Sequence, residues 1–198
     1  MIHQSPFYKV LGSSPLRQGK YSISSVRMED AEPIRNWRNA QISALRQSDK
    51  LSKTEQIIYF QKLINHDFSL DHPPKILVRF CVEKELIGYG GIVHLDWTNL
   101  RGEVSFLLET SRTENHHQYA AELSVFFHLI KEVAFIKLGL NKLSTEAYAH
   151  RDHHVLAIEE AGFRRDGVLR EHTLIQGEWV DAVVASCLSS EYVNTTDK

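Results

Sequence analysis

The chain has 198 residues, of which 42% are hydrophobic and 24% are charged, and its formal net charge at pH 7 is -2. This size and composition predict one globular domain with a full-sized core. The near-neutral charge argues against a protein built for bulk nucleic-acid binding, because such proteins carry a basic excess, so small molecules or other proteins are the expected partners.

The sequence shows no pattern typical of membrane insertion or export. No segment approaches the roughly 18 consecutive apolar residues of a membrane span, and the first residues lack the apolar stretch of a secretory signal. Cys81 and Cys187 lie in apolar runs typical of strands, so we expect buried thiols rather than a disulfide or a nucleophile. These features predict a cytoplasmic protein without membrane contact.

The first third of the chain is expected to hold a strand and two helices. Residues 1–20 lack periodicity, which predicts a loosely ordered lead-in before a single domain over residues 21–193, with a frayed tail at 194–198. A strand begins at Tyr21, and a helix follows Asp30, a suitable N-cap. Ser52 and Glu55 have the spacing of a capping box and mark the start of a second helix.

Three strands are expected in the middle of the chain. Hydrophobic residues alternate over 76–82, and the apolar run over 86–97 contains three glycines, which indicate a bulge or a close approach of another backbone. The run from Val104 to Leu108 is short and nearly continuously apolar. It is therefore expected at the centre of a sheet, with both faces covered.

A long amphipathic helix follows that central strand. Apolar residues recur at intervals of three and four over 119–134, while Glu122, Lys131 and Glu132 lie mostly elsewhere around the axis. The first turn of a helix has unpaired N–H groups and partial positive charge. The start of this helix is therefore a candidate site for an anionic ligand.

The last elements complete a mixed sheet. A strand is expected over 142–148, then a short helix capped by Asp152, and then a hairpin with strands over 168–175 and 179–188, joined by Gln176 and Gly177. Taken in order, the elements predict a mixed α/β (α+β) sheet with most of its antiparallel pairs early in the chain.

Three segments carry a family likeness: VRMEDAEPIRNWRN, AFIKLGLNKLSTEAYA and IEEAGFRRDGVLREHTLIQGEWVDAVVASCL. Together with the element order they resemble the GNAT superfamily of N-acetyltransferases, most closely the branch of ribosomal-protein N-terminal and amino-sugar N-acetyltransferases. The likeness extends from Tyr21 to Tyr192. It implies a mixed, mostly antiparallel sheet with a central splayed parallel strand pair and helices on both faces, with acetyl-CoA as co-substrate.

By this resemblance, acetyl-CoA lies in a gap between two splayed parallel strands, Val104 to Glu109 and Lys142 to Tyr148. The backbone of Leu107, Leu108 and Glu109 would contact the pantetheine, and the start of the following helix would hold the pyrophosphate. The family's loop carries a glycine there. In this chain the matching positions read Asn115, His116, His117, Gln118, Tyr119 and Ala120, with Gln118 in the place of the glycine.

The missing glycine matters because a Cβ hinders the approach of backbone N–H groups to phosphate oxygens. Arg112, His116 and His117 can offer side-chain contacts that offset the loss. The alternative is that the two histidines are solvated loop residues.

The resemblance also implies catalytic positions. Glu103 lies where a glutamate of this branch takes the proton of the amine, directly or through water, and an ordinary strand-edge carboxylate is the alternative. The family's acid, a serine or tyrosine, and the asparagine before it correspond here to His154 and Arg151. His154 can donate a proton near neutral pH, or be a structural histidine, and Arg151 can reach a phosphate or the substrate.

The acceptor side of the family's cleft matches Trp37, Arg38, Asn39 and Arg46. Arginine side chains there can bind acidic or hydroxyl-rich groups, and the alternative is a set of surface helix residues around a core tryptophan. No metal is expected, because the histidine spacing over 150–154 matches no common zinc site.

The sequence therefore predicts an acetyl-CoA-dependent N-acetyltransferase, monomeric or homodimeric. Its acceptor would be a primary amine, either on a small molecule such as an amino sugar or on a protein N-terminus. The competing hypothesis is a catalytically silent GNAT-like module that binds an acyl-CoA or a partner. The missing loop glycine, Arg151 and His154 motivate that second hypothesis.

Overall fold

The computed structural model describes residues 5–192, which form a mixed α/β fold. An eight-stranded sheet has the strand order β1-β2-β3-β4-β5-β6-β8-β7. The strands are β1 Leu16–Gln18, β2 Tyr21–Ser25, β3 Ile76–Val82, β4 Glu85–Asp96, β5 Arg101–Leu108, β6 Lys142–Tyr148, β7 Arg164–Ile175 and β8 Glu178–Leu188. The α-helices of the described residues are α1 Ala31–Ala40, α2 Lys53–Asn65, α3 His116–Lys131 and α4 Asp152–Glu160.

The parallel pair β5–β6 opens into a gap. Neighbouring strands of the described sheet are antiparallel except for this pair. Its ladder joins residues 101–103 of β5 to residues 142–144 of β6, and the two strands separate after Glu103 and Ser144. The predicted mostly antiparallel sheet with a central splayed parallel pair is therefore confirmed.

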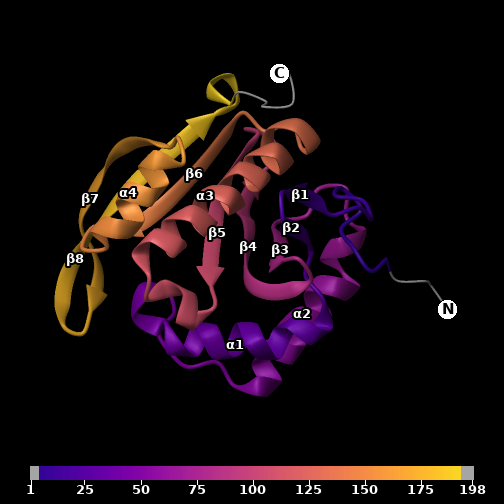
Figure 1. Cartoon of the computed structure of the whole chain (residues 1–198), viewed down its shortest axis with the longest axis horizontal. Helices are drawn as coiled ribbons and strands as arrows, with labels where there is room; N and C mark the ends of the chain where they lie inside the picture. Colours follow the sequence, from indigo (N-terminus) through magenta and orange to yellow (C-terminus); the bar gives the residue numbers. More distant parts are fainter. Residues whose placement is uncertain (1–4, 193–198) are drawn as a thin grey trace.

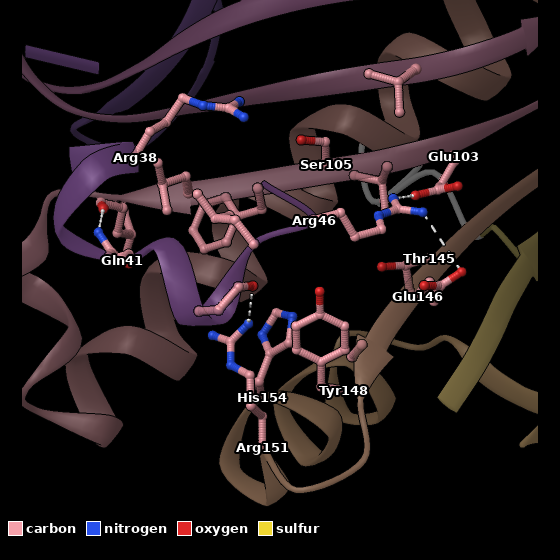
Figure 2. Close-up of a pocket in the computed structure, with 18 of the residues that line it drawn as sticks. Arg38, Gln41, Arg46, Glu103, Ser105, Thr145, Glu146, Tyr148, Arg151 and His154 are labelled. Atoms are coloured by element: carbon pink, nitrogen blue, oxygen red, sulfur yellow. Dashed lines mark hydrogen bonds and ion pairs between the residues drawn. The ribbon is translucent and has the colours of Figure 1, made fainter. Parts of the chain in front are cut away.

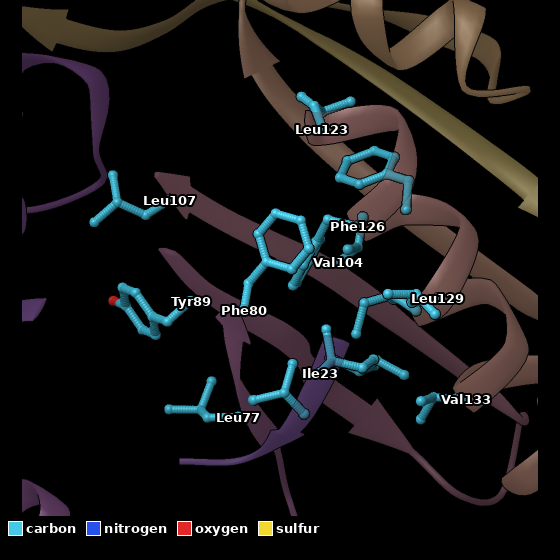
Figure 3. Close-up of a cluster of buried hydrophobic side chains, with 14 of the residues drawn as sticks. Ile23, Leu77, Phe80, Tyr89, Val104, Leu107, Leu123, Phe126, Leu129 and Val133 are labelled. Carbon is cyan, nitrogen blue, oxygen red and sulfur yellow. The ribbon is translucent and has the colours of Figure 1, made fainter. Parts of the chain in front are cut away.

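Helices cover both faces of the sheet. Helix α3 runs across one face, with α4 beside it, while α1 and α2 lie side by side near the end of the sheet toward which β5 points (Figure 1). Figure 3 shows Phe126 of α3 among Phe80 and Val104, whereas Tyr89 and Leu107 point away from α3. All five side chains are buried, so the sheet has an apolar layer on each side.

Local sequence signals explain where several elements begin and turn. The Ser52 hydroxyl accepts a hydrogen bond from the N–H of Glu55 at 3.2 Å, and the Ser52 N–H donates to the Glu55 carboxylate at 2.8 Å, so the predicted capping box is confirmed. Gln176 and Gly177 have φ values of 52° and 88°. Two successive positive φ values fit a type I′ turn, which joins β7 to β8 in the predicted hairpin.

Two predicted helix caps differ in detail. Helix α1 begins after Asp30, but this carboxylate accepts a hydrogen bond from the N–H of Arg27 at 2.8 Å and pairs with Arg79 at 3.2 Å. Helix α4 begins at Asp152 itself, and Arg151 takes the N-cap position. In the first case a buried ion pair competes for the side chain that the helix would otherwise use.

The segment before Tyr21 is packed on the domain, unlike the predicted lead-in. Residues 16–18 pair with β2. Tyr8 is fully buried, its hydroxyl accepts a hydrogen bond from the N–H of Leu77 at 3.1 Å, and its ring centroid lies 4.3 Å from that of Phe68. A single aromatic anchor has no periodicity, so the sequence pattern did not indicate it. The predicted frayed tail at 194–198 lies outside the described residues.

Both cysteines are buried, free thiols, as expected. Across residues 5–192, none of the helices combines the length and the apolar character that crossing a membrane requires.

Candidate active site

A cavity of about 230 Å³ lies where β5 and β6 separate. Figure 2 shows side chains converging on it from both strands, from α4 and from the segment that follows α1. The predicted site residues that line it are Arg38, Arg46, Glu103, Leu107, Leu108, Tyr119, Arg151 and His154. Glu109, Arg112, Asn115, His116, His117, Gln118, Ala120, Trp37 and Asn39 are not among its lining residues.

Alternate backbone groups of β5 face the gap. The carbonyl oxygens of Ser105 and Leu107 point toward β4, where each lies against a glycine of that strand. In an antiparallel ladder the intervening residues direct their N–H and C=O groups to the other side. Phe106 and Leu108 therefore face β6 across the gap, an arrangement that suits an extended ligand with amide groups, such as pantetheine.

Of the three expected backbone contacts, only Leu108 faces the gap. Its carbonyl accepts a hydrogen bond from the side-chain amide of Gln41 at 2.8 Å. Leu107 is directed to β4, and the N–H of Glu109 donates to a β4 carbonyl at 2.8 Å. Phe106, which the resemblance did not indicate, also directs its backbone groups to the gap side of β5.

Arg46, Glu103 and Glu146, which we call the charged trio, meet at the closed end of the gap (Figure 2). The Arg46 guanidinium donates through Nη2 to Glu103, and its Nη1 lies 3.6 Å from Glu146 Oε2. The two carboxylate side chains are 17% and 15% exposed, and that of Arg46 is 49% exposed. Burial lowers the pKa of Arg46, but bonding to Glu103 and the nearby carboxylate charges raise it above its ordinary value.

His154 lies at the other end of the cavity as a neutral imidazole. Its Nδ1 is 2.8 Å from the Tyr119 hydroxyl of α3. Burial, with smaller effects of Arg151 and His153, lowers the pKa of His154 to about 3, whereas burial raises the pKa of Tyr119. The Tyr119 hydroxyl therefore keeps its proton and can donate to Nδ1, and we assign the imidazole proton to Nε2. His154 does not titrate near neutral pH, unlike the proton donor expected from the sequence.

The first turn of α3 is capped by the chain itself. The side-chain oxygen of Asn115 accepts hydrogen bonds from the N–H groups of His117 and Gln118, both at 3.1 Å. Asparagine is among the preferred N-cap residues. An incoming phosphate would compete with this carboxamide for the same donors, and Gln118 adds a Cβ where the family has a glycine.

Arg112 forms an ion pair inside the protein. Its Nη1 lies 2.6 Å from Glu122 Oε1, and its Nε lies 3.5 Å from Glu109 Oε2. Glu122 is only 3% exposed, so the expectation that it lies away from the core face is wrong. A carboxylate can be buried there because Arg112 neutralises it and Gln118 donates to it at 3.3 Å. Arg112 is thus committed to a carboxylate rather than free for a phosphate.

The predicted loop histidines behave differently from each other. His116 stacks on His153 of α4, with ring centroids 4.2 Å apart and an interplanar angle of 4°. Burial and the neighbouring His116 lower the pKa of His153. His117 is exposed, and Ala120 is half-buried. The stack joins the start of α3 to α4, and His117 remains at the surface beside the helix start.

The acceptor-side residues divide into two that line the cavity and two that support it. Arg38 and Arg46 line the cavity, and the Arg38 guanidinium donates to the Tyr89 hydroxyl at 2.7 Å. Asn39 bonds to the backbone of the loop before α2 at 2.9 Å and 2.8 Å. Trp37 packs against the hydrophobic core. Asn39 therefore holds the loop that carries Arg46.

A second hollow of about 490 Å³ adjoins the cavity. It lies between residues 42–48, which follow α1, and residues 173–176, at the end of β7 and the start of the hairpin turn. Arg46 and Tyr148 line both hollows. Glu103 lines the first of these hollows and not the second.

The sequence reasoning missed Glu146 and Tyr148. Strand alternation places both on one face of β6 with Ser144, a polar face beside the predicted gap, so the signal was present. Burial raises the pKa of Tyr148, and the nearby Arg46 partly opposes this. In the described part of the chain, no three His, Cys, Asp or Glu side chains are grouped so that they could hold a metal ion.

Comparisons with known proteins agree with this architecture. The family description "Acetyltransferase (GNAT) domain" matches residues 23–184. An uncharacterized N-acetyltransferase, p20, of Bacillus licheniformis is 21% identical over 178 residues, covering 87% of this chain and 95% of that protein. The spermidine N-acetyltransferase of Vibrio cholerae, solved with CoA and spermine, superposes with a TM-score of 0.78 at 20% identity, covering 89% of this chain and 100% of that one. A point mutant of the same enzyme gives a TM-score of 0.76 at 18% identity, covering 90% of this chain and 99% of that one. The chain therefore belongs to the GNAT acetyltransferase family and is an acetyl-CoA-dependent N-acetyltransferase.

Proposed function

We propose that the chain acetylates the primary amine of a small molecule and that Glu103 takes the proton of that amine. The observation that carries the proposal is the position of Glu103 at the closed end of the gap between β5 and β6, on the wall of the cavity. The gap-side backbone groups of Phe106 and the N–H of Leu108 support an acetyl-CoA thioester placed along the same strand, since the Leu108 carbonyl is bonded to Gln41.

The reaction needs a base because most of the acceptor is protonated. An amine with a pKa of about 10.4 is only about one part in a thousand neutral at pH 7, a handicap of roughly 4 to 5 kcal/mol. Glu103 accepts the ammonium proton, directly or through water, and the freed nitrogen lone pair forms the new N–C bond. Acetyl-CoA supplies the acetyl carbon, and its sulfur leaves with the electron pair of the broken C–S bond.

The leaving sulfur then needs a proton, and Tyr148 is the donor that we propose. The second proton that the nitrogen loses as the amide forms returns to the Tyr148 oxygen, so the hydroxyl is restored. This hydroxyl points into the space between Arg46 and His154 in Figure 2. Burial raises the pKa of Tyr148, so the hydroxyl carries its proton at neutral pH. With its pKa lowered to about 3, His154 carries no titrating proton to give. We propose instead that His154 holds the Tyr119 side chain in place through their hydrogen bond and forms part of the cavity wall.

A small acceptor is favoured over a protein N-terminus. The hollow that adjoins the cavity lies between residues 42–48 and residues 173–176, and its volume of about 490 Å³ suits a small molecule. The similar structure from Vibrio cholerae was solved with spermine, which is also a small amine. The free thiols of Cys81 and Cys187 support a reducing compartment such as the cytoplasm as the place of action.

The test combines acetyl-CoA binding with turnover. Calorimetric titration with acetyl-CoA is expected to show binding, and thiol release is expected with small primary amines but not with a peptide N-terminus. Glu103→Gln keeps the shape and removes the base, so kcat/KM at pH 7 should fall by about 100-fold or more. Glu160→Gln, on the exposed side of α4, is the matched control and should retain full turnover. A Glu103→Gln enzyme with normal rates across neutral pH would remove Glu103 from the mechanism.

A further inference from the structure

The charged trio conflicts with a simple role of Glu103 as a base. A base must meet the acceptor ammonium, yet the Arg46 guanidinium already holds Glu103. The same guanidinium lies 3.6 Å from Glu146. Two carboxylates from neighbouring strands therefore bind one cation that belongs to the protein itself, as Figure 2 shows.

Arg46 stands at the boundary between the two hollows. It lines the cavity beside β5 and β6, and it lines the adjoining hollow between residues 42–48 and the hairpin turn. An acceptor that enters by the adjoining hollow therefore reaches Arg46 before it reaches Glu103. The side chain must move for the amine and the carboxylate to meet.

The charge of the trio selects for a cation. Two carboxylates face one guanidinium, and the imidazole of His172 lies 3.6 Å from Glu146 with 41% of its side chain exposed. The guanidinium already faces two carboxylates, so an acidic acceptor would add a third negative charge beside it. Removal of Arg46 would leave two carboxylates together, which favours an incoming group with two positive charges.

Arg46 is held in a way that permits exchange. It lies between α1 and α2, after the short turn at Ile42–Ala44, and about half of its side chain is exposed. Water reaches the guanidinium although the two carboxylate side chains are only 17% and 15% exposed, so the ion pairs are partly screened and another cation can replace the guanidinium. Asn39 holds the loop backbone, so the Arg46 side chain can swing out while the loop remains in place.

We propose that Arg46 is a latch that occupies the place of the acceptor, and that the acceptor is a small amine with a second ammonium group. The proposal rests on the acetyl transfer proposed above. When the acceptor displaces Arg46, one ammonium group pairs with Glu146 and the other gives its proton to Glu103. A monoamine would leave one carboxylate unpaired, and an amino acid would add a third negative charge.

The test uses three probes with the same four-carbon length: butylamine, 1,4-diaminobutane and 4-aminobutanoate. Binding is measured by calorimetry and turnover by thiol release, for the parent, Arg46→Gln and Glu146→Gln. Arg46→Met, which keeps the aliphatic stem, is a second latch variant. Arg101→Gln is the matched control, because Arg101 pairs with Asp96 at 3.2 Å and lines neither hollow.

The parent should prefer the diamine, and loss of the latch should tighten diamine binding by about five-fold, the equilibrium equivalent of one partly screened ion pair. Glu146→Gln should remove the preference for the diamine, and Arg101→Gln should change nothing. Unchanged or weaker diamine binding in both Arg46 variants overturns the latch. If the parent prefers 4-aminobutanoate and Arg46→Gln loses that preference, the latch is overturned. Arg46 would then bind the carboxylate of an acidic acceptor.

The two proposals can fail separately. If amines are acetylated but the Arg46 variants bind the diamine no better than the parent, the latch is wrong and the acetyl transfer stands. If the variants bind the diamine more tightly but no amine is acetylated, the proposed function is wrong and the exchange of cations stands.

Discussion

Replacement of His154 by asparagine should remove a steep acid sensitivity of folding. Burial lowers the pKa of His154 to about 3 in the folded protein, against about 6.5 in an unfolded chain. Between these values the unfolded state binds a proton that the folded state does not, so unfolding is favoured as pH falls. The cost is about 1.4 kcal/mol for each pH unit below 6.5, or about 2 kcal/mol at pH 5.

Asparagine is the suitable substitute because its side-chain oxygen can take the place of Nδ1 and accept from the Tyr119 hydroxyl, which lies 2.8 Å from Nδ1. The assay is urea unfolding of both proteins at pH 5, 6, 7.5 and 8.5. The difference in unfolding free energy should move by about 2 kcal/mol in favour of the variant between pH 7.5 and pH 5. His94→Asn is the control, because it makes the same substitution at an exposed position of β4, where the histidine is not buried. A parent–variant difference that stays constant with pH would refute a neutral, buried His154.

Three further substitutions test the packing around the site. Arg112→Met should lower the stability of the protein by about 3 kcal/mol in thermal unfolding, because it leaves the buried Glu122 without its ion pair. The double variant Arg112→Met with Glu122→Leu should recover most of this loss. A normal melting temperature of the single variant would show that the ion pair contributes no stability. Gly90→Ala should destabilise the fold by about 1–3 kcal/mol or more, because the new Cβ would collide with a β5 carbonyl and lie 2.7 Å from a phenyl ring of α3. Gly167→Ala is the control: its Cβ would meet nothing within 4 Å, so this variant should unfold like the parent. Ser52→Ala removes the cap of α2 and should cost about 1 kcal/mol in urea unfolding, and a change confined to acetyl transfer would contradict this role.

Much of the fold could be predicted because its signals are local. Alternation marked β3 and β6, the Ser52 capping box marked α2, and the pair Gln176 and Gly177 marked the last hairpin. The splay of β5 and β6 is different in kind. The splay depends on where the hydrogen-bonded ladder between the two strands stops, and hydrophobic periodicity does not encode that point. Its prediction therefore rested on the family resemblance alone.

The site was less predictable because its important pairs are distant in sequence. Glu103 was identified as a candidate base, but its partner Arg46 lies 57 residues away. The burial of Glu122 contradicts the helical pattern, because an ion pair to Arg112 outweighs the usual exclusion of charge from a core. Glu146 was accessible to sequence reasoning, since strand alternation places it on a polar face beside the gap. It was missed because the family resemblance directed attention to β5.

Both ends of the site share one design. At the start of α3, the carboxamide oxygen of Asn115 binds the N–H groups that a phosphate oxygen would otherwise use. At the closed end of the gap, the guanidinium of Arg46 binds the carboxylates that an ammonium group would otherwise meet. In each place a side chain of matching polarity and charge keeps otherwise unpaired groups satisfied. Binding therefore exchanges one partner for another at both ends. The affinity of each ligand reflects the difference between its contacts and those of the side chain that it displaces, so that difference can be tuned at Asn115 and Arg46 without altering β5.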